Sequence, residues 1–263
     1  MIRRLVLSTV LFCGMVAALP AAHAVADPSP GLIRVTEVVG DARTADRITV
    51  LVPGAGVTPG NFQAGLGNVT RRAPAKWAHW LADEARDGRV AVIAWLGYLP
   101  PKGASLAVAR GERADVGARE LEGYVAELAV ANPRATITLV GHSYGSVVVG
   151  HAAAALPASV TDLVFVGSPG TGAHTVRDLG TRARVWAGRS ADDWISRIPN
   201  ATILGYGHDT DPTAPDFGAR ALPVDGVSGH DGYFVPGTGS LRALASISTT
   251  GTLPDPTGGA GLG

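Results

Sequence analysis

The chain has 263 residues, of which 46% are hydrophobic and 17% are charged, and its 22 basic side chains balance its 22 acidic ones. This composition excludes disorder driven by like-charge repulsion, and the neutral balance offers no electrostatic basis for binding nucleic acid or an anionic membrane. The only cysteine, Cys13, cannot form a disulfide within the chain. We therefore expect a globular domain that is long enough to bury a full core.

The first 24 residues have the three-part pattern of a secretory signal peptide. An arginine pair precedes an apolar run at residues 5–19, and a small-residue triplet ends at Ala24. The run is shorter than the roughly 20 apolar residues that a membrane-spanning helix needs. We expect cleavage after Ala24, with Ala26 as the neighbouring alternative. The exported protein would then carry no transmembrane segment and would be extracellular or associated with the cell envelope.

Residues 25–263 are expected to form a single domain, with an ordered core at about residues 32–250. Five apolar runs in this domain are short, rich in β-branched residues and followed by loops, as is typical of buried strands. They are residues 48–52, 90–95, 136–140, 163–166 and 184–187. Four further segments have the apolar spacing of helices. They are residues 74–85, 112–130, 147–156 and 241–247.

The alternation of buried strands and helices predicts a mainly parallel sheet with helices on both faces. In such sheets ligands bind beyond the carboxyl ends of the strands, so the loops after the five strands are expected to converge on one site. Only residues 167–182 separate the fourth strand from the fifth. This connection is too short for a helical lid, so we expect an open site without a large lid domain.

A candidate nucleophile follows the third predicted strand. The sequence GHSYG at residues 141–145 matches G-x-S-x-G between a strand and a helix. At such a junction the serine, here Ser143, occupies a sharp, strained turn that exposes its hydroxyl above the sheet. Gly141 and Gly145 have no side chain that would clash where the strand and the helix approach each other. The context predicts that Ser143 is a catalytic nucleophile.

A serine hydroxyl needs a base that takes its proton, and His230 is the preferred candidate. In a fold with this nucleophile turn the order along the chain is nucleophile, acid, histidine, which requires a downstream histidine. His230 lies in a loop before the last predicted helix, and His208 is the alternative. His142 and His151, which lie on the nucleophile turn and its helix, are expected to serve in packing and hydrogen bonding.

The acid that orients the histidine is expected after the fifth strand, where Asp192 and Asp193 are adjacent. We prefer Asp193, because an acid followed by one residue and then an aliphatic one, here Ile195, is the commoner arrangement in this loop. Asp192 is the alternative. Adjacent side chains usually point apart, so only one of the two should reach the histidine.

The oxyanion of a tetrahedral intermediate needs two backbone donors. One is expected to be the amide of Tyr144, the residue after the nucleophile. The other is expected in the sequence PGAG after the first strand, from Ala55 or, as the next choice, Gly56. Phe62 and Tyr98, in the loops after the first two strands, are candidate substrate-binding walls or ordinary packing aromatics.

Three motifs carry a resemblance to a known family. They are GHSYGS at residues 141–146, HDTDPTAPDFGAR at residues 208–220 and GHDGYF at residues 229–234. Over about residues 47–247 the chain resembles an actinobacterial group of α/β-hydrolases. The resemblance implies an α/β-hydrolase fold and a serine triad of Ser143, Asp193 and His230, but no substrate. It leaves the role of residues 208–220 open, either as a loop that orders the histidine or as a ligand contact.

These features predict a secreted serine hydrolase that cleaves carboxylic esters, as an esterase or a lipase-like enzyme does. The substrate is expected to be a small-molecule, lipid or polymer ester. The alternatives are an amidase or peptidase with the same triad, and a non-catalytic protein that binds the cell envelope. PGAG is not a dinucleotide loop, and the acidic cluster at residues 208–211 matches no metal motif, so neither a cofactor nor a metal is expected. The oligomeric state is left open.

Overall fold

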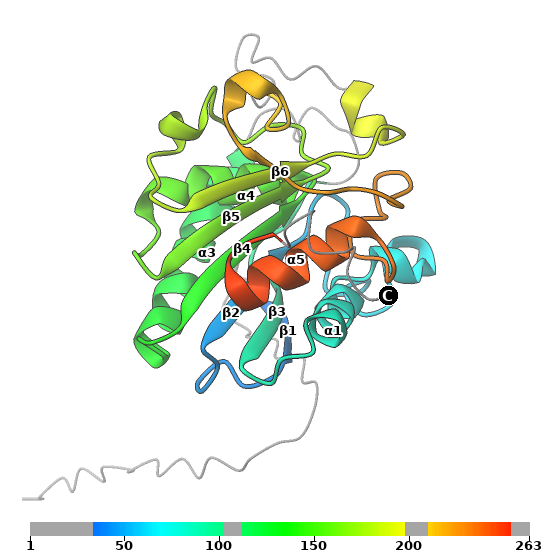
Figure 1. Ribbon diagram of the computed structural model, residues 1–263. Coiled ribbons are helices and arrows are strands. Elements are labelled where there is room, and N and C mark those ends of the chain that lie inside the picture. Colours follow the sequence, from blue (N-terminus) through cyan, green and yellow to red (C-terminus); the bar gives the residue numbers. More distant parts are fainter. Residues whose placement is uncertain (1–33, 102–111, 198–209, 254–263) are drawn as a thin grey trace, which may run out of the picture.

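The computed structural model of the chain describes residues 34–101, 112–197 and 210–253. The expected signal segment and the alternative base His208 lie outside these ranges. The described residues form a seven-stranded sheet in the order β1-β3-β2-β4-β5-β6-β7 (Figure 1). The strands are β1 (Val35–Val39), β2 (Arg47–Val52), β3 (Val90–Leu96), β4 (Thr136–His142), β5 (Val160–Val166), β6 (Arg184–Gly188) and β7 (Arg220–Ala221).

The sheet is parallel except at β1, which pairs antiparallel with β3 at one edge. The five predicted strands are confirmed as β2 to β6, and every residue of β3 is buried. Continuous burial is expected of strands that are covered on both faces. The sequence analysis missed β1 and β7. Glu37 interrupts the apolar pattern of β1, and β7 is a pair of exposed residues that no periodicity can reveal.

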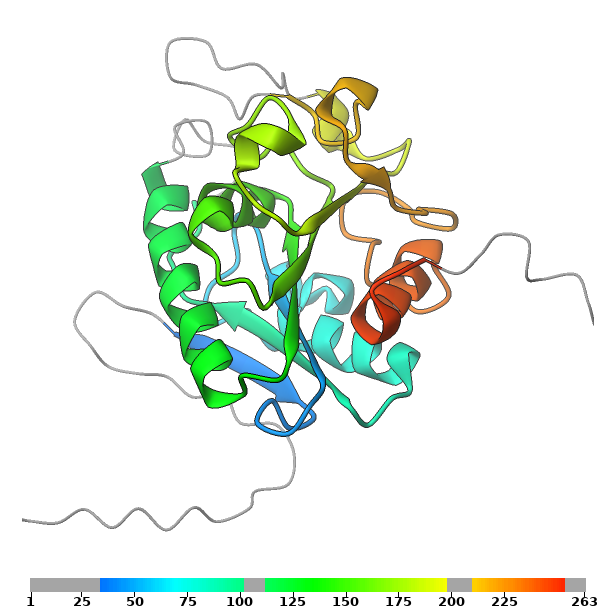
Figure 2. The same cartoon turned by 60° about the vertical axis from the view of Figure 1, so that its left-hand side comes forward.

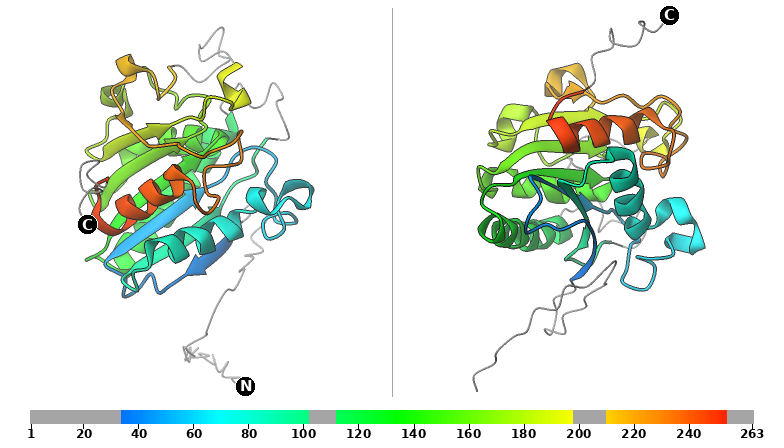
Figure 3. Two further views of the ribbon diagram at one scale, coloured as in Figure 1. Left: turned by 45° about the vertical axis from the view of Figure 1, so that its right-hand side comes forward. Right: turned by 60° about the horizontal axis from the view of Figure 1, so that its bottom comes forward.

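Helices cover both faces of the sheet. They are α1 (Pro74–Ala85), α3 (Glu112–Ala131), α4 (Tyr144–Ala152) and α5 (Gly239–Thr250). α1 packs against α5 on one face, and α3 packs against α4 on the other (Figures 2 and 3). Both α1 and α3 match the predicted segments closely. α4 begins three residues before the predicted helix, because it starts directly after Ser143.

The connection between β5 and β6 is described throughout and contains one short helix, η4 (Val176–Leu179). As expected, it provides no helical lid. Among the described residues, no helix combines the length and the apolar character needed to cross a bilayer. The loops that follow the parallel strands β2, β4, β5 and β6 begin at the carboxyl edge of the sheet, where such sheets bind ligands.

Candidate active site

Ser143 lies at the junction of β4 and α4, in a backbone conformation that is rare for a residue with a side chain. Its φ is 54° and its ψ is −129°. Positive φ is costly for residues other than glycine, and such outliers concentrate at functional sites. The turn is held by its backbone, since the Ser143 amide donates to the carbonyl of Val166 at 3.1 Å and the Ser143 carbonyl accepts from the amide of Ser146 at 2.9 Å.

Close backbone approaches around Ser143 account for three neighbouring glycines. A Cβ on Gly145 would lie 2.1 Å from the carbonyl oxygen of Val52, and one on Gly141 would lie 2.7 Å from the Cα of Ser146. The expectation that these two glycines are needed for close packing is confirmed. A Cβ on Gly54 would lie 2.6 Å from the Cβ of Ser143, so the loop after β2 lies directly against the turn.

His230 and Asp193 form a buried pair at the carboxyl edge of the sheet. The Nδ1 of His230 lies 2.8 Å from one carboxylate oxygen of Asp193 and 3.0 Å from the other. A carboxylate can only accept, so Nδ1 carries the proton and donates it. In the neutral imidazole, Nε2 is then the unprotonated nitrogen. Both His230 and Ser143 line the same cavity, which places a free basic nitrogen and a hydroxyl in one site.

Two further groups donate to the Asp193 carboxylate. The hydroxyl of Tyr233 donates at 2.5 Å and the amide of Ile195 at 2.9 Å. Burial alone would raise the pKa of Asp193, but the hydrogen bond and charge of His230, together with these two donors, lower it below the usual value. Asp193 is therefore held ionised.

Asp192 contacts the backbone of the histidine loop and not its ring. Its carboxylate accepts from the Gly229 amide at 2.9 Å, from the Ser228 hydroxyl at 3.2 Å and from the Ser190 hydroxyl. The Ser190 and Gly229 bonds lower the pKa of Asp192. Of the two adjacent carboxylates, Asp193 thus binds the His230 ring, and Asp192 binds the amide of Gly229, the residue before His230.

His142 connects the nucleophile turn to the histidine loop. Its Nε2 donates to the backbone carbonyl of His230 at 2.8 Å, and its ring packs edge-on against Trp77 with centroids 5.2 Å apart. Burial, reinforced by the nearby His230 ring, lowers the pKa of His142 to about 4. The expected packing and hydrogen-bonding role of His142 is confirmed, although its partner was not foreseen. Outside the site, His151 pairs with Asp115 at 2.7 Å.

The structure separates the candidate oxyanion donors. The amide of Gly56 donates to the carbonyl of Pro101 at 2.9 Å, so it is engaged within the protein. The expectation that Gly56 could serve as an oxyanion donor is therefore wrong, because the Pro101 carbonyl in the loop after β3 already accepts from its amide. Ala55 lines the cavity with Ser143, and Tyr144 opens α4 as its first residue. Ala55 and Tyr144 remain the candidate donors.

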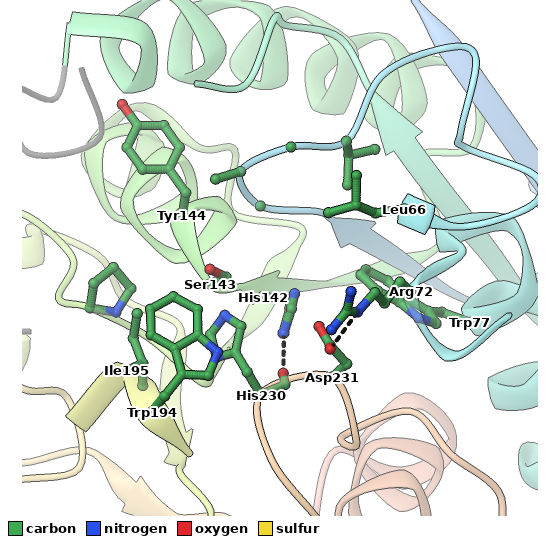
Figure 4. A pocket seen from close by; sticks show the side chains of 15 residues that line it. Leu66, Arg72, Trp77, His142, Ser143, Tyr144, Trp194, Ile195, His230 and Asp231 are labelled. Carbon is green, nitrogen blue, oxygen red and sulfur yellow. Dashed lines mark hydrogen bonds and ion pairs between the residues drawn. The ribbon is translucent and has the colours of Figure 1, made fainter. Parts of the chain in front are cut away.

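The cavity around Ser143 has a volume of about 410 Å³ (Figure 4). Apolar side chains make most of its wall, and they come from the loops after β2, β5 and β6 and from α1. They are Ala55, Val57, Leu66, Trp77, Pro169, Trp194 and Ile195. Trp194 is 45% exposed and Leu66 is 42% exposed. The ring centroids of Trp194 and His230 are 4.6 Å apart. Sequence reasoning missed these walls, although Trp194 directly follows the predicted acid.

Phe62 and Tyr98 do not line the cavity, which corrects their prediction as substrate-binding walls. Both are buried, and the Tyr98 hydroxyl donates to the carbonyl of Pro53 at 2.7 Å. Burial raises the pKa of Tyr98 well above its usual value. In its described part, residues 97–101, the loop after β3 supports residues 53–56 and does not form a wall. Among the described residues, those of four of the five expected loops line the cavity.

Gly167, at the end of β5, makes room for the buried pair. Its φ is 56°, and a Cβ there would lie 3.0 Å from a carboxylate oxygen of Asp193 and 3.2 Å from the Nδ1 of His230. The same Cβ would lie 2.8 Å from the Tyr233 ring. Sequence analysis missed this residue, and its only signal was a glycine at the end of a strand.

The described part of the segment 208–220 supports the loop that carries the acid. Asp211 forms an ion pair with Arg189, just before that loop, and accepts from the Thr213 amide at 2.9 Å. Phe217 is buried, and β7 pairs with β6. The described residues of this segment thus contact β6 and the start of the loop that carries the acid, and none of them lines the cavity.

Comparisons with known proteins agree with this architecture. A family model described as alpha/beta hydrolase (Abhydrolase_8) matches residues 27–203. The uncharacterized proteins MT2140 and Rv2079 of two Mycobacterium tuberculosis strains are each 28% identical, over 82% of this chain and 37% of their own length. The chain thus spans little more than a third of these relatives.

Several solved structures share the fold. Esterase PE8 is 14% identical with a TM-score of 0.53, covering 80% of this chain and 95% of its own. Dienelactone hydrolase from Anabaena variabilis is 18% identical with a TM-score of 0.51, covering 88% and 95%. An alpha-beta serine hydrolase homologue from Coxiella burnetii is 10% identical with a TM-score of 0.50, covering 89% and 99%. At these identities the likeness extends to the fold alone.

Proposed function

Because the chain belongs to the alpha/beta hydrolase family, we propose that it is a serine hydrolase that cleaves carboxylic esters through Ser143, His230 and Asp193. One observation carries the proposal. Ser143 is held at positive φ between a strand and a helix, and it faces a cavity that it shares with a histidine whose other nitrogen is bound to a buried carboxylate. This is the arrangement by which a serine hydroxyl is activated.

The first half of the reaction forms an acyl-enzyme. His230 Nε2 takes the proton of the Ser143 hydroxyl as the oxygen attacks the ester carbonyl, and ionised Asp193 stabilises the imidazolium that results. The oxyanion accepts hydrogen bonds from the amides of Tyr144 and Ala55. When the intermediate collapses, the bond to the alcohol oxygen breaks and His230 returns the proton to that oxygen.

The second half releases the acid. Water donates a proton to His230 Nε2 as it attacks the acyl carbon, and the same two amides stabilise the second oxyanion. Collapse of this intermediate breaks the bond to Ser143 Oγ, which recovers the proton from His230. The cycle consumes one water molecule and restores the neutral imidazole.

Esters are favoured over peptides by the character of the cavity. Extended peptides are recognised largely through main-chain hydrogen bonds. The described lining consists mostly of apolar side chains, and it includes the ion pair of Arg72 and Asp231. Such a wall suits an acyl or alkyl group better than a polypeptide backbone. Amidase activity and a purely binding role are the alternatives that the experiment must exclude.

The test uses residues 25–263 and two measurements. A fluorophosphonate probe should label Ser143, identified by peptide mass spectrometry, and nitrophenyl esters of increasing acyl length should be hydrolysed. Ser143→Ala should abolish both. Ser246→Ala is a matched control, because Ser246 is a half-buried serine on α5 that donates to the carbonyl of Thr252. Persistent ester hydrolysis by Ser143→Ala, or cleavage of peptide substrates alone, would contradict the proposal.

We also propose that residues 1–24 direct export, as the sequence pattern indicates. Expression of the full chain in a secreting actinobacterial host should yield a protein in the medium or envelope that begins at Val25, or at Asp27 for the alternative site. Intact-mass measurement of the exported protein identifies the cleavage site. A cytosolic protein that retains the whole apolar run would refute export.

A further inference from the structure

An arginine–aspartate pair forms part of the cavity wall, and the proposed catalytic mechanism does not use it. Arg72 ends the short helix η2 (Thr70–Arg72), and Asp231 directly follows His230. The Nε of Arg72 lies 2.6 Å from one carboxylate oxygen of Asp231. Their side chains are 39% and 19% exposed. Among the described lining residues, Arg72 is the only lysine or arginine.

The pair engages one edge of the guanidinium. Nε is bound to Asp231, and in the described part of the chain the two terminal nitrogens of Arg72 form no hydrogen bond, and Arg72 forms no ion pair with another residue. Figure 4 shows the guanidinium end directed toward the centre of the site, in the direction of His142. A guanidinium presents five donors in a fixed fork, so its end edge remains open to a ligand.

Open donors on an apolar wall need an acceptor once a substrate displaces water. Leaving the terminal N–H donors of Arg72 without an acceptor in a desolvated site is costly, and a neutral alkyl group would do this. The end edge of a guanidinium matches a carboxylate, which can accept two parallel hydrogen bonds. The nearby Asp231 charge offsets part of the attraction for an anion, so it should limit the affinity.

From this geometry we propose that Arg72 binds a carboxylate of the substrate, and that the enzyme prefers esters that carry a second, ionised carboxyl group. The inference rests on the proposed esterase function. The cavity of about 410 Å³ holds Arg72 and Ser143 on its wall together, so one short substrate can reach both. The carboxylate can belong to the acyl part or to the alcohol part of the ester, and the two arms of the experiment separate these sources.

Each arm compares two esters of matched size. For the acyl part, they are nitrophenyl hydrogen adipate and its uncharged methyl ester. For the alcohol part, they are carboxyphenyl butyrate and carbamoylphenyl butyrate. In the arm whose carboxylate reaches Arg72, kcat/KM of the wild type should be about ten- to a hundredfold higher for the anionic ester than for the uncharged one. This is the range expected for hydrogen bonds to charged groups. Arg72→Gln should remove this preference, and Arg72→Lys should retain part of it.

Asp231→Asn separates anion binding from a structural role of the pair. It keeps an oxygen that accepts from Nε but removes the negative charge, so the preference for the anionic ester should rise. A merely structural role predicts that Arg72→Gln lowers kcat/KM of both esters equally, and that result would overturn the inference. Arg242→Gln is the matched control, because it breaks an exposed pair with Asp225 that is not part of the cavity wall.

A binding measurement makes the test independent of turnover. Monomethyl adipate, titrated by calorimetry, should bind the wild type and should bind Arg72→Gln about tenfold more weakly. Equal binding to both would refute the carboxylate site even if esters are hydrolysed. Hydrolysis of neither ester, with binding intact, would count against the proposed esterase function and not against the carboxylate site.

Discussion

The nucleophile and its two partners are held in place by different kinds of interaction. Ser143 depends on the backbone: a strand, a helix and a neighbouring loop meet at distances that only glycines allow. Asp193 and His230 lie on long loops and are held by side chains. Tyr233 donates to Asp193, and His142 donates to the His230 carbonyl. Asp192 and the Arg189–Asp211 pair hold the two loops beside them.

The two regions should therefore respond differently to substitution. A close-packed backbone has no room to adjust, so an added methyl group displaces whole elements. A network of side-chain hydrogen bonds can lose one member and still leave the rest in place, at a cost of about 1–3 kcal/mol for each buried group left unpaired. Substitutions near Ser143 should affect folding and activity together, whereas those in the two loops should mainly affect activity.

The largest effect is expected from Gly145→Ala. Its Cβ would lie 2.1 Å from the Val52 carbonyl oxygen, so α4 must move away from β2. We expect a loss of about 3 kcal/mol or more in the free energy of unfolding, together with loss of ester hydrolysis. Chemical denaturation followed by circular dichroism measures the stability.

Gly123→Ala is the matched control for this substitution. Gly123 lies within α3, and a Cβ there would meet nothing within 4 Å. Replacing a helical glycine by alanine should stabilise the protein by up to about 1 kcal/mol. Equal stability of the two variants would show that the turn tolerates a side chain and would remove the distinction between backbone and side-chain control.

Asp193→Asn should have the next largest effect, on activity alone. The amide cannot fix the histidine in the tautomer with a proton on Nδ1, and loss of the triad carboxylate costs about 10⁴-fold in kcat in enzymes of this type. Asp192→Asn keeps an acceptor for the Gly229 amide and should lower kcat by less than about tenfold. Steady-state kinetics of the two variants compare adjacent carboxylates directly. The reverse order of effects would assign the catalytic role to Asp192.

Tyr233→Phe should have a moderate effect with a distinct pH signature. It removes a donor at 2.5 Å from Asp193, and we expect kcat/KM to fall by about tenfold. That hydroxyl helps to lower the pKa of Asp193, so its removal raises this pKa. Activity needs both the ionised carboxylate and the unprotonated imidazole, so the acid limb of the kcat/KM profile reports the coupled titration of the Asp193–His230 pair and should move to higher pH. An unchanged profile with a lower rate would indicate loss of packing alone.

The contrast between the two regions also explains what the sequence could predict. The turn at Ser143 is local, so five residues between a strand and a helix were sufficient to predict it. The choice between Asp192 and Asp193 depends on contacts with residues 37 positions away, which no local pattern contains. For the same reason Gly56 was accepted as a donor, because its bond to Pro101 is visible only in three dimensions.

The apolar walls were missed for a related reason. Phe62 and Tyr98 were chosen because aromatic residues near a site often line it, but the fold buries both of them. Trp194 was overlooked, although it follows the acid and is partly exposed beside His230. Loop direction, which decides whether a side chain enters the core or the cavity, depends on the packing of whole elements.

The smallest effect at neutral pH is expected from His142→Gln, and its value lies in the pH dependence. Glutamine can still donate to the His230 carbonyl, so kcat near neutral pH should change by less than about threefold. In the wild type, the pKa of His142 is lowered to about 4, against 6.5 for an unperturbed histidine. Between these values the unfolded chain binds a proton that the folded chain excludes, so this contribution to stability is complete above pH 6.5.

The contribution decreases as the pH falls from 6.5 toward 4, by an amount on the order of 3 kcal/mol for a shift of this size. The free energy of unfolding of the wild type should fall across that window, and that of His142→Gln should fall less. Denaturant titrations at several pH values measure the difference in slope. Parallel curves would mean that the folded and unfolded chains bind the proton of His142 equally, and burial would then not lower the pKa of this histidine.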